Sequence, residues 1–524
     1  MKKIVISLLL VVLLIDVDAQ LRLPQIFGDS MVLQRDRPIT VWGWGEKGEK
    51  IAIQFHNQSI SVVVGADGVW RVNLAEEKAG GPYRLVVKGS SLIEFKDVLV
   101  GDVWICSGQS NMELTISNTN NSKSEIEAAN YPLIRHLKIP NTVAFHPELD
   151  TRTGKGWHTA NPTQVASFSA VGYYFARNLQ HELKIPIGLI NTSWSGTQVE
   201  TWTSGEAFVS SDEFKDLYKD IKSINLDSVI IDKEKLLHER IQKIQGSSPI
   251  ASDVTAWKEN GFNDSPAVNP NSFPSLLFNA MIHPLTSYSI KGVIWYQGER
   301  NANAGRSYQY RKAFPLMITD WRNHWKQGDF PFYFVQLSSF NYDNGNSQKG
   351  SSWAELREAQ TMALSLPNTG MAVTTDIGNA KDIHPRNKLD VGKRLALIAL
   401  YHSYQKNVEY SGPDFQSMSV NGKEVILSFS HYDGLKAQGQ NRILTGFEIA
   451  GEDQHFYKAT ARISGKQVII SAPEILLPLA VRYAWADDAG SANLFNQSGL
   501  PAVPFRTDNW QSITINGKYK ITGK

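Results

Sequence analysis

The sequence has little of several features that mark large classes of protein. It contains a single cysteine, Cys106, in 524 residues, so no internal disulfide framework can form. It carries 53 Lys and Arg against 51 Asp and Glu, whereas nucleic-acid-binding proteins usually show a clear basic excess. After the N-terminus there is no apolar run long enough to span a bilayer, and no internal repeat. With 42% hydrophobic residues, we expect a globular protein of several domains, without a nucleic-acid partner and stabilised by packing alone.

The N-terminus resembles an export signal. Lys2 and Lys3 precede an apolar run over residues 4–15, and residues 17–19 resemble the small-residue site at which a signal peptide is cleaved. The run is short for a transmembrane helix, although a membrane anchor is the alternative. We therefore expect residues 1–19 to be a signal peptide. The mature protein would be secreted or periplasmic, in a Gram-negative bacterium, with no membrane span.

The remaining chain divides into three parts by its hydrophobic pattern. Residues 20–97 show short alternating stretches between glycine-rich turns, which predicts a small β domain. Residues 406–524 return to the same pattern and predict a C-terminal β-rich region. Between them, strand and helix patterns alternate from 98 to 405, which predicts an α/β core with a parallel sheet covered on both faces. Residues 205–270 are charged and poor in strand signals, and we interpret them as an insertion in this core.

Polar and glycine-rich residues follow several predicted strands of the core. Gly108-Gln109-Ser110-Asn111-Met112 follows the strand at 98–106, and Asn191 to Thr197 follows the strand at 187–190. Gln297 to Asn301 follows the strand at 290–296, and Asp376 to Pro385 follows the strand at 371–375. In an open parallel sheet, ligands bind beyond the carboxyl ends of the strands. These four segments should therefore meet at one edge of the sheet.

Acyl transfer could use this set of side chains. Ser110 would be the nucleophile, and His384 the base that a serine hydroxyl requires. A tetrahedral intermediate needs preorganised donors, which the Ser110 amide, the Gly196 amide and the Asn301 side chain could supply. Each residue alone has a plainer interpretation as a turn, loop or helix-cap residue. The order of the four segments, each after a strand, favours the chemical interpretation.

The four segments resemble those of the SGNH hydrolases, in which Ser, Gly, Asn and His come from separate blocks. The sequence around these segments resembles that of the sialate O-acetylesterase family within this superfamily. The similar stretches are Gly101–Glu113, Asn191–Trp202, Trp295–Asn301 and Asp382–Lys388, with further likeness at Leu23–Arg35, Val481–Ala486 and Asn493–Asn496. This resemblance covers nearly the whole mature chain. It implies a three-layer α/β/α core and a serine esterase that removes acetyl groups from carbohydrate through an acyl-enzyme intermediate. It implies no metal or organic cofactor.

The carboxylate that would support His384 departs from the superfamily pattern. An aspartate usually lies three residues before the histidine, but Lys381 occupies that position here and Asp382 lies two before. Residues two apart in an extended segment point to the same side, so Asp382 could still reach the imidazole. Glu299, two residues before Asn301, is the alternative. We favour Asp382, and a Ser–His dyad with weak support from either carboxylate stays open.

The substrate is less well defined than the chemistry. An O-acetylated glycan, foremost O-acetylated sialic acid, is the expected partner, and acetylated xylan would suit the same mechanism. A non-catalytic carbohydrate-binding protein is the alternative of a different class. The candidate substrate-binding residues are Gln109, Trp194, Gln297, Arg300 and Arg386. Trp194 could stack on a sugar or belong to the core, and either arginine could pair with a carboxylate or form a surface salt bridge. The sequence does not indicate an oligomeric state.

Overall fold

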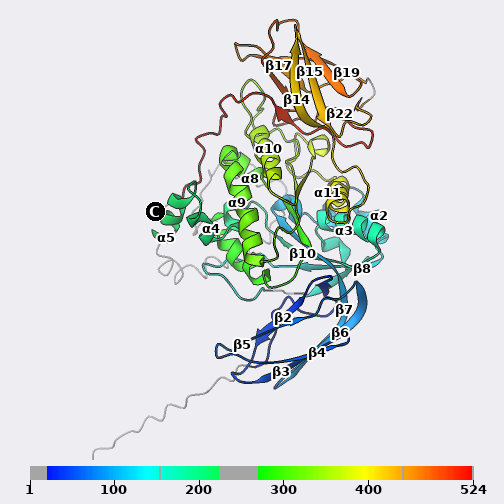
Figure 1. The fold of residues 1–524 in the computed structure, drawn as a ribbon, viewed down its shortest axis with the longest axis vertical. Helices are drawn as coiled ribbons and strands as arrows, with labels where there is room; N and C mark the ends of the chain where they lie inside the picture. The colour runs from blue at the N-terminus through cyan, green and yellow to red at the C-terminus, as the bar shows by residue number, and fades with distance from the viewer. Residues whose placement is uncertain (1–19, 153–154, 224–269, 440–441, 522–524) are drawn as a thin grey trace, which may run out of the picture.

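The centre of the protein is a twisted sheet in the order β13-β12-β11-β7-β10-β8-β9 (Figure 1). The computed structural model describes residues 20–152, 155–223, 270–439 and 442–521. Neighbouring strands are parallel except β8 and β9. The strands are β7 Leu92–Gly108, β8 Tyr131–Lys138, β9 Trp157–Ala160, β10 Ile187–Ser193, β11 Gly292–Tyr296, β12 Phe332–Val335 and β13 Thr369–Ala372. The predicted parallel α/β sheet is thereby confirmed.

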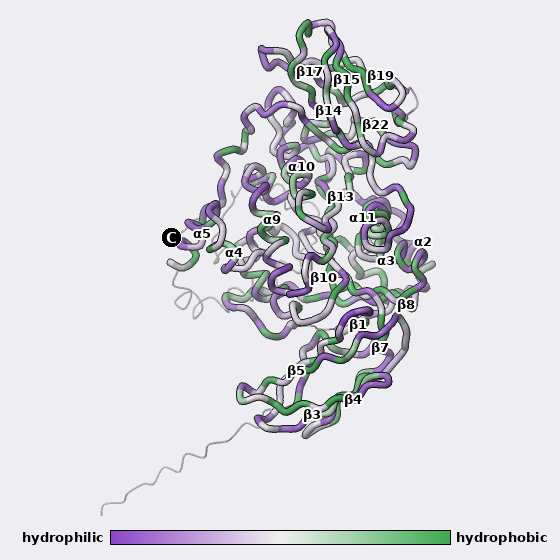
Figure 2. Tube along the Cα trace, in the orientation of Figure 1, coloured by the Kyte–Doolittle hydropathy of each residue, from purple (hydrophilic) through white to green (hydrophobic). Residues whose placement is uncertain are grey.

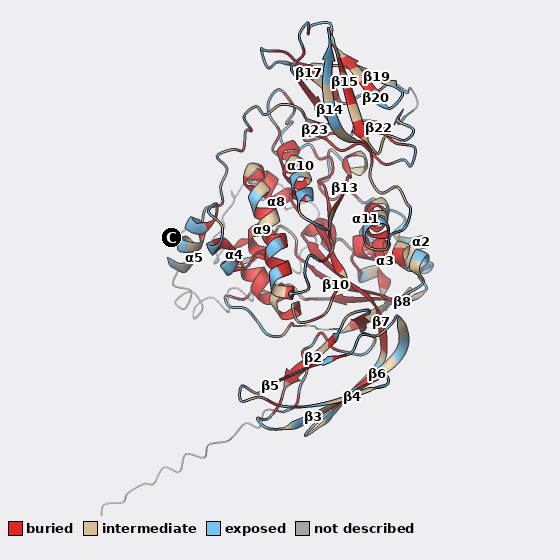
Figure 3. Cartoon of the chain, viewed as in Figure 1, coloured by how far each residue is buried: buried red, intermediate tan, exposed pale blue. Residues whose placement is uncertain are grey.

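Helices cover both faces of this sheet, because its strands are apolar on both sides (Figure 1). In β7, Trp104 and Cys106 share a core with helices α3 (Ala170–Leu183) and α11 (Lys388–His402). Val103 and Ile105 belong to the core that includes helix α9 (Ser307–Trp325) and its neighbour α10 (Ser352–Met362). Successive strand residues point to opposite faces, which explains the alternation. Figure 3 shows these central strands as buried. Cys106 is fully buried.

The N-terminal β region is joined to the central sheet through β7. Its strands are β1 Val32–Gln34, β2 Ile39–Trp44, β3 Lys50–Phe55, β4 Gln58–Val63, β5 Val69–Leu74 and β6 Gly80–Lys88. The first half of β7 pairs with β6, and the second half pairs with β10 and β11. The domain boundary predicted at residues 97 and 98 therefore lies inside a continuous strand. A rigid connection between the two regions follows.

The C-terminal β region packs two antiparallel sheets around a separate core. One sheet contains β14 Asp414–Asn421, β15 Glu424–Ser430, β20 Gln467–Ser471 and β19 Thr460–Ser464; the other contains β18 Phe456–Lys458, β17 Phe447–Ala450, β21 Ala480–Tyr483 and β23 Phe505–Arg506. Apolar stretches occur in each of the three regions (Figure 2). After β23 the chain returns to the central region, where the Thr514 amide donates to Glu355 at 3.1 Å and the Tyr519 amide to Gln309 at 2.7 Å. This tail fixes the C-terminal region to α9 and α10.

Some sequence expectations differ from the structure or lie outside it. The sequence does not predict β8 and the edge strand β9, because β8 carries Arg135, His136 and Lys138. Those side chains have specific partners: Arg135 pairs with Asp97, and His136 stacks on Phe168. The expected signal peptide, residues 1–19, lies outside the described residues, as do residues 224–269 of the expected insertion. Within the described ranges, no helix combines the length and apolar character needed to cross a membrane.

Candidate active site

Ser110 lies where β7 gives way to helix α1 (Ser110–Glu113). The turn depends on Gly108, which has φ 131°, and a Cβ there would lie 2.2 Å from the Tyr296 carbonyl oxygen. Only glycine tolerates this approach of β7 to β11 at such a φ. Ser110 is 7% exposed. The sharp end of the strand therefore presents the serine at the carboxyl edge of the sheet.

His384 contacts the Ser110 hydroxyl directly. Its Nε2 atom lies 2.7 Å from Ser110 Oγ, although the two residues are 274 positions apart. Among the described residues Nδ1 has no hydrogen-bond partner, since Asp382 instead accepts from the His384 main-chain amide at 2.9 Å. Burial lowers the pKa of His384 to about 4; the charge of Lys388 lowers it further and that of Asp382 opposes the shift. His384 is therefore an unprotonated base at neutral pH.

Glu299, the alternative support for the histidine, belongs to a buried network under the site. Its carboxylate accepts from Asn111 Nδ2 at 2.5 Å, and the same amide donates to the Ile383 carbonyl at 3.0 Å. Lys388 Nζ donates to Asn111 Oδ1 at 2.6 Å. Burial raises the pKa of Glu299 and lowers that of Lys388 to about 7. Asn111 thus connects the serine segment with the segments that carry Glu299 and His384, and neither carboxylate bonds to the imidazole.

Replacing Asn111 by alanine is expected to lower the free energy of unfolding by about 3 kcal/mol or more, since buried polar and charged partners lose their hydrogen bonds. Lys388, Glu299 and the Ile383 carbonyl would all be affected. Denaturant titration measures the change. Asn118→Ala is the matched control, because the partly buried Asn118 bonds only Thr115 and Ser117 and should cost less than about 1 kcal/mol. Equal losses in the two variants would contradict the role of the network.

The Gly196 segment lies beside Ser110, in the loop after β10. Gly196 has φ 72°, a conformation that favours glycine. The Trp194 amide donates to the Gly108 carbonyl at 3.1 Å, which brings this loop against the end of β7. The amides of Ser110 and Gly196 have no acceptor in the part of the chain that the structure describes. Both amides are therefore available to a bound oxyanion.

Asn301, expected as the third oxyanion donor, is oriented differently. Its Nδ2 atom lies 3.0 and 3.2 Å from the two carboxylate oxygens of Glu200. Its Oδ1 atom accepts from the Val199 amide at 3.1 Å and from Gln297 Nε2 at 2.8 Å. The buried Glu200 is the physical reason, because a charged acceptor competes strongly for the amide. In this structure Asn301 holds the segment Val199–Trp202 through its bonds with Val199 and Glu200.

Four of the five candidate substrate-binding residues are buried. Trp194 is 1% exposed and part of the hydrophobic core, so it offers no stacking face to a sugar. Gln297 bonds Thr197, Asn301 and Tyr310, and the Gln109 amide group lies 3.2 Å from the Thr197 carbonyl. Arg300 is 3% exposed. These four side chains are packed inside the protein, whereas Arg386, two residues after His384, is exposed.

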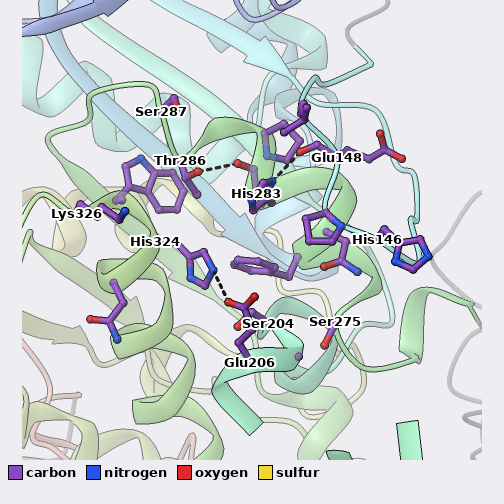
Figure 4. A pocket seen from close by; sticks show the side chains of 18 of the residues that line it. His146, Glu148, Ser204, Glu206, Ser275, His283, Thr286, Ser287, His324 and Lys326 are labelled. Atoms are coloured by element: carbon purple, nitrogen blue, oxygen red, sulfur yellow. Dashed lines mark hydrogen bonds and ion pairs between the residues drawn. The ribbon is translucent and has the colours of Figure 1, made fainter. Parts of the chain in front are cut away.

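A cavity of about 1680 Å³ lies elsewhere, between the N-terminal β region and the core. Figure 4 shows His283 and His324 in it, with His324 Nε2 3.5 Å from the Glu206 carboxylate. None of its lining residues belongs to the four polar segments. Across the described residues, no group of three or more His, Cys, Asp and Glu side chains is arranged to hold a metal ion.

Comparison with known proteins identifies the family of this chain. A family model described as carbohydrate esterase, sialic acid-specific acetylesterase, matches residues 100–230 and 251–400. Sialate O-acetylesterase of Rattus norvegicus is 30% identical over 522 residues, covering 91% of this chain and 92% of that protein. The Homo sapiens enzyme of the same name is 29% identical and covers 92% of each.

A solved structure agrees with these sequence relatives. The crystal structure of a carbohydrate acetylesterase from Xanthomonas citri is 37% identical, with a TM-score of 0.80, and the match covers 94% of this chain and all of that one. Because the likeness spans the β regions as well as the core, it concerns the whole architecture. The chain is a carboxylic ester hydrolase and belongs to the carbohydrate esterase family of the sialic acid-specific acetylesterases.

Proposed function

We propose that this chain is a serine esterase that removes acetyl groups from O-acetylated sialic acid through an acetyl-enzyme intermediate. The observation that carries the proposal is the 2.7 Å contact between His384 Nε2 and Ser110 Oγ. This distance suits direct proton transfer from the hydroxyl to the imidazole. The depressed pKa of His384 keeps the ring unprotonated and ready to accept that proton.

In the first half of the reaction, Ser110 Oγ attacks the acetyl carbonyl carbon while its proton moves to His384 Nε2. The carbonyl π electrons move to oxygen, and the Ser110 and Gly196 amides donate to the resulting oxyanion. As the tetrahedral intermediate collapses, the ester C–O bond breaks and His384 Nε2 gives its proton to the sugar oxygen. The deacetylated sugar leaves, and the acetyl group stays on Ser110.

In the second half, a water molecule takes the place of the sugar. His384 accepts a proton from the water as its oxygen attacks the acetyl carbon, and the same two amides stabilise the second oxyanion. Collapse breaks the bond to Ser110 Oγ, which regains its proton from His384. Acetic acid leaves and ionises in solution. The imidazolium is transient in both halves and, without a bond from Nδ1 to a carboxylate, acts as part of a dyad.

The names of the sequence relatives favour a sialate substrate. These proteins are sialate O-acetylesterases, and the match covers nearly their whole length. Arg386 supplies a suitable charge, since it is exposed and lies in the segment of His384. A guanidinium pairs with the carboxylate of an acidic sugar and gains nothing from a neutral one. Acetylated xylan is the second candidate, because the solved neighbour is described only as a carbohydrate acetylesterase. A binding protein without activity is the third.

We further propose that the protein is exported. Residues 1–19 have the basic start, apolar run and small-residue cleavage site of a signal peptide. Sequencing the N-terminus of the protein secreted from its host tests this. A mature chain that begins at Gln20 would support cleavage after Ala19, and an intact Met1 would contradict it.

Acetate release from two substrates tests the proposed function. The mature protein is incubated with 9-O-acetylated sialoglycoprotein and with acetylated xylan, with Ser110→Ala as the inactive control. We expect release from the sialoglycoprotein, and a larger loss for Arg386→Gln on that substrate than on a neutral acetyl ester. Release from xylan alone would keep the mechanism and replace the substrate. Background release from both by the wild type would favour the binding protein.

A further inference from the structure

Glu113 connects the helix of the nucleophile with the loop that carries Gly196. It is the last residue of α1, three positions after Ser110. Its Oε2 atom accepts from the Ser195 main-chain amide at 2.7 Å, and its Oε1 atom accepts from Asn141 Nδ2 at 2.9 Å. Ser195 directly precedes Gly196, so the carboxylate holds the peptide next to the proposed oxyanion donor.

Glu113 is the contact that this loop receives from the helix of Ser110, beside the contact of Gln109 with the Thr197 carbonyl. The Trp194 amide bonds the Gly108 carbonyl, and Asn271 Nδ2 donates to the Ser195 carbonyl at 3.3 Å. Neither contact comes from the helix that begins with Ser110. A hydrogen bond from a main-chain amide to an ionised carboxylate is short and strong. The Glu113 side chain therefore contributes directly to the placement of the Gly196 peptide relative to Ser110.

Charge around Glu113 supports this arrangement. Lys138 Nζ lies 3.6 Å from Glu113 Oε1 and donates to the Ser193 carbonyl at 2.7 Å. The lysine thus contacts the start of the same loop while it neutralises the carboxylate. The Glu113 side chain is 26% exposed, so it lies at the rim of the site and outside the hydrophobic core.

We propose that Glu113 is a positioning residue, which sets the place of the Gly196 amide in the oxyanion hole. The inference rests on the proposed serine mechanism, in which Gly196 donates to the oxyanion. Because the oxyanion forms only during reaction, misplacing its donor lowers kcat and leaves substrate binding nearly unchanged. Loss of one oxyanion donor typically costs about 10²- to 10³-fold, and a displaced donor costs less.

Steady-state kinetics of the mature protein with a small acetyl ester tests the inference. Glu113→Ala removes the acceptor, and we expect kcat to fall about 10- to 100-fold with KM changed less than about three-fold. Glu113→Gln should retain most of the activity, because its carbonyl can accept from Ser195. Its new NH₂ group can donate to Asn141, whose Oδ1 atom has no partner among the described residues.

The control is a carboxylate of similar exposure away from the site. Glu358 in α10 is 23% exposed and accepts from Arg506 at 2.8 Å. Glu358→Ala should lose comparable folding contacts and keep kcat within about two-fold of the wild type. An unchanged kcat in Glu113→Ala would overturn the inference, as would equal losses in Glu113→Ala and Glu113→Gln. Full activity of Ser110→Ala would overturn the proposed mechanism and, with it, the inference. If Ser110→Ala is inactive and Glu113→Ala is fully active, the inference alone is overturned.

Discussion

Replacing Ser110 by alanine is expected to reduce kcat/KM for acetyl esters by at least about 10⁴-fold, because the proposed nucleophile is removed and the oxyanion donors and substrate binding alone leave only about 10³- to 10⁴-fold over the uncatalysed reaction. Ser110 is the only residue that bonds His384 Nε2 in the described structure, so no neighbouring hydroxyl stands ready to replace it. Hydrolysis of a chromogenic acetyl ester and acetate release from glycan should fall together. A loss confined to one substrate would place the reaction elsewhere.

The acetyl-enzyme itself can be detected. With the wild type, acid quenching during turnover should leave an acetyl group on the peptide that contains Ser110, and mass spectrometry would locate it. Ser117→Ala is a suitable control, since this serine lies seven residues further on and bonds only Thr115 and Asn118. Its activity should match the wild type. An adduct on Ser110 that persists in the control and is absent from Ser110→Ala would support covalent catalysis.

The sequence predicts the position of Ser110 at the end of a strand because the signal is local. An apolar strand must end where polar residues begin, and Gly108 permits the tight approach to β11 that the structure shows. The pairing of Ser110 with His384 is a consequence of sheet topology, since β7 lies in the middle of the sheet and the His384 segment follows β13 at its edge. Parallel strands bring their carboxyl ends to one side, so the order of segments along the chain is enough to predict that they meet.

The orientation of individual side chains could not be predicted in the same way. Asn301 has the expected position, but the buried Glu200 accepts its amide, and nothing in the local sequence around Asn301 indicates that competitor. Glu113 and Lys388 were not identified as functional, although their spacing was a usable signal. Glu113 lies three residues after Ser110 in α1, a distance that places two side chains on one side of a helical turn. Lys388 begins α11 four residues after His384. Their partners come from distant segments, which only the fold reveals.

The structure also favours an unusually acid-tolerant enzyme. The pKa of His384 is lowered to about 4, first by burial and then by the charge of Lys388, and Asp382 opposes the shift without bonding the ring. At pH 5 such a base is about 90% unprotonated, whereas one with the ordinary pKa of 6.5 would be about 3% unprotonated, a difference of about thirty-fold. We therefore expect kcat/KM to fall less than about two-fold between pH 7 and pH 5.

Stability should respond to pH in the same window. The unfolded chain binds a proton on this histidine below about pH 6.5, whereas the folded chain binds it only near pH 4. Stability is therefore complete above pH 6.5 and is lost as the pH falls toward 4, by about 3 kcal/mol from this group. His136, whose pKa burial lowers to about 3, adds a loss of the same sign. Denaturant titrations at pH 7 and pH 4.5 measure the sum.

Lys388→Met separates the electrostatic cause of the acid tolerance from burial. Removing the buried ammonium takes away a charge that disfavours the imidazolium, so the acid limb of kcat/KM should move to higher pH while the burial of His384 persists. Lys393→Met is the matched control, because Lys393 is an exposed lysine on the same helix, and its acid limb should stay with that of the wild type. The pH dependence of kcat/KM for the three proteins decides the matter. An acid limb that stays in place in Lys388→Met would leave desolvation as the sole cause. A wild-type limb near pH 6.5 would mean that the imidazolium of the free enzyme is stabilised by a carboxylate.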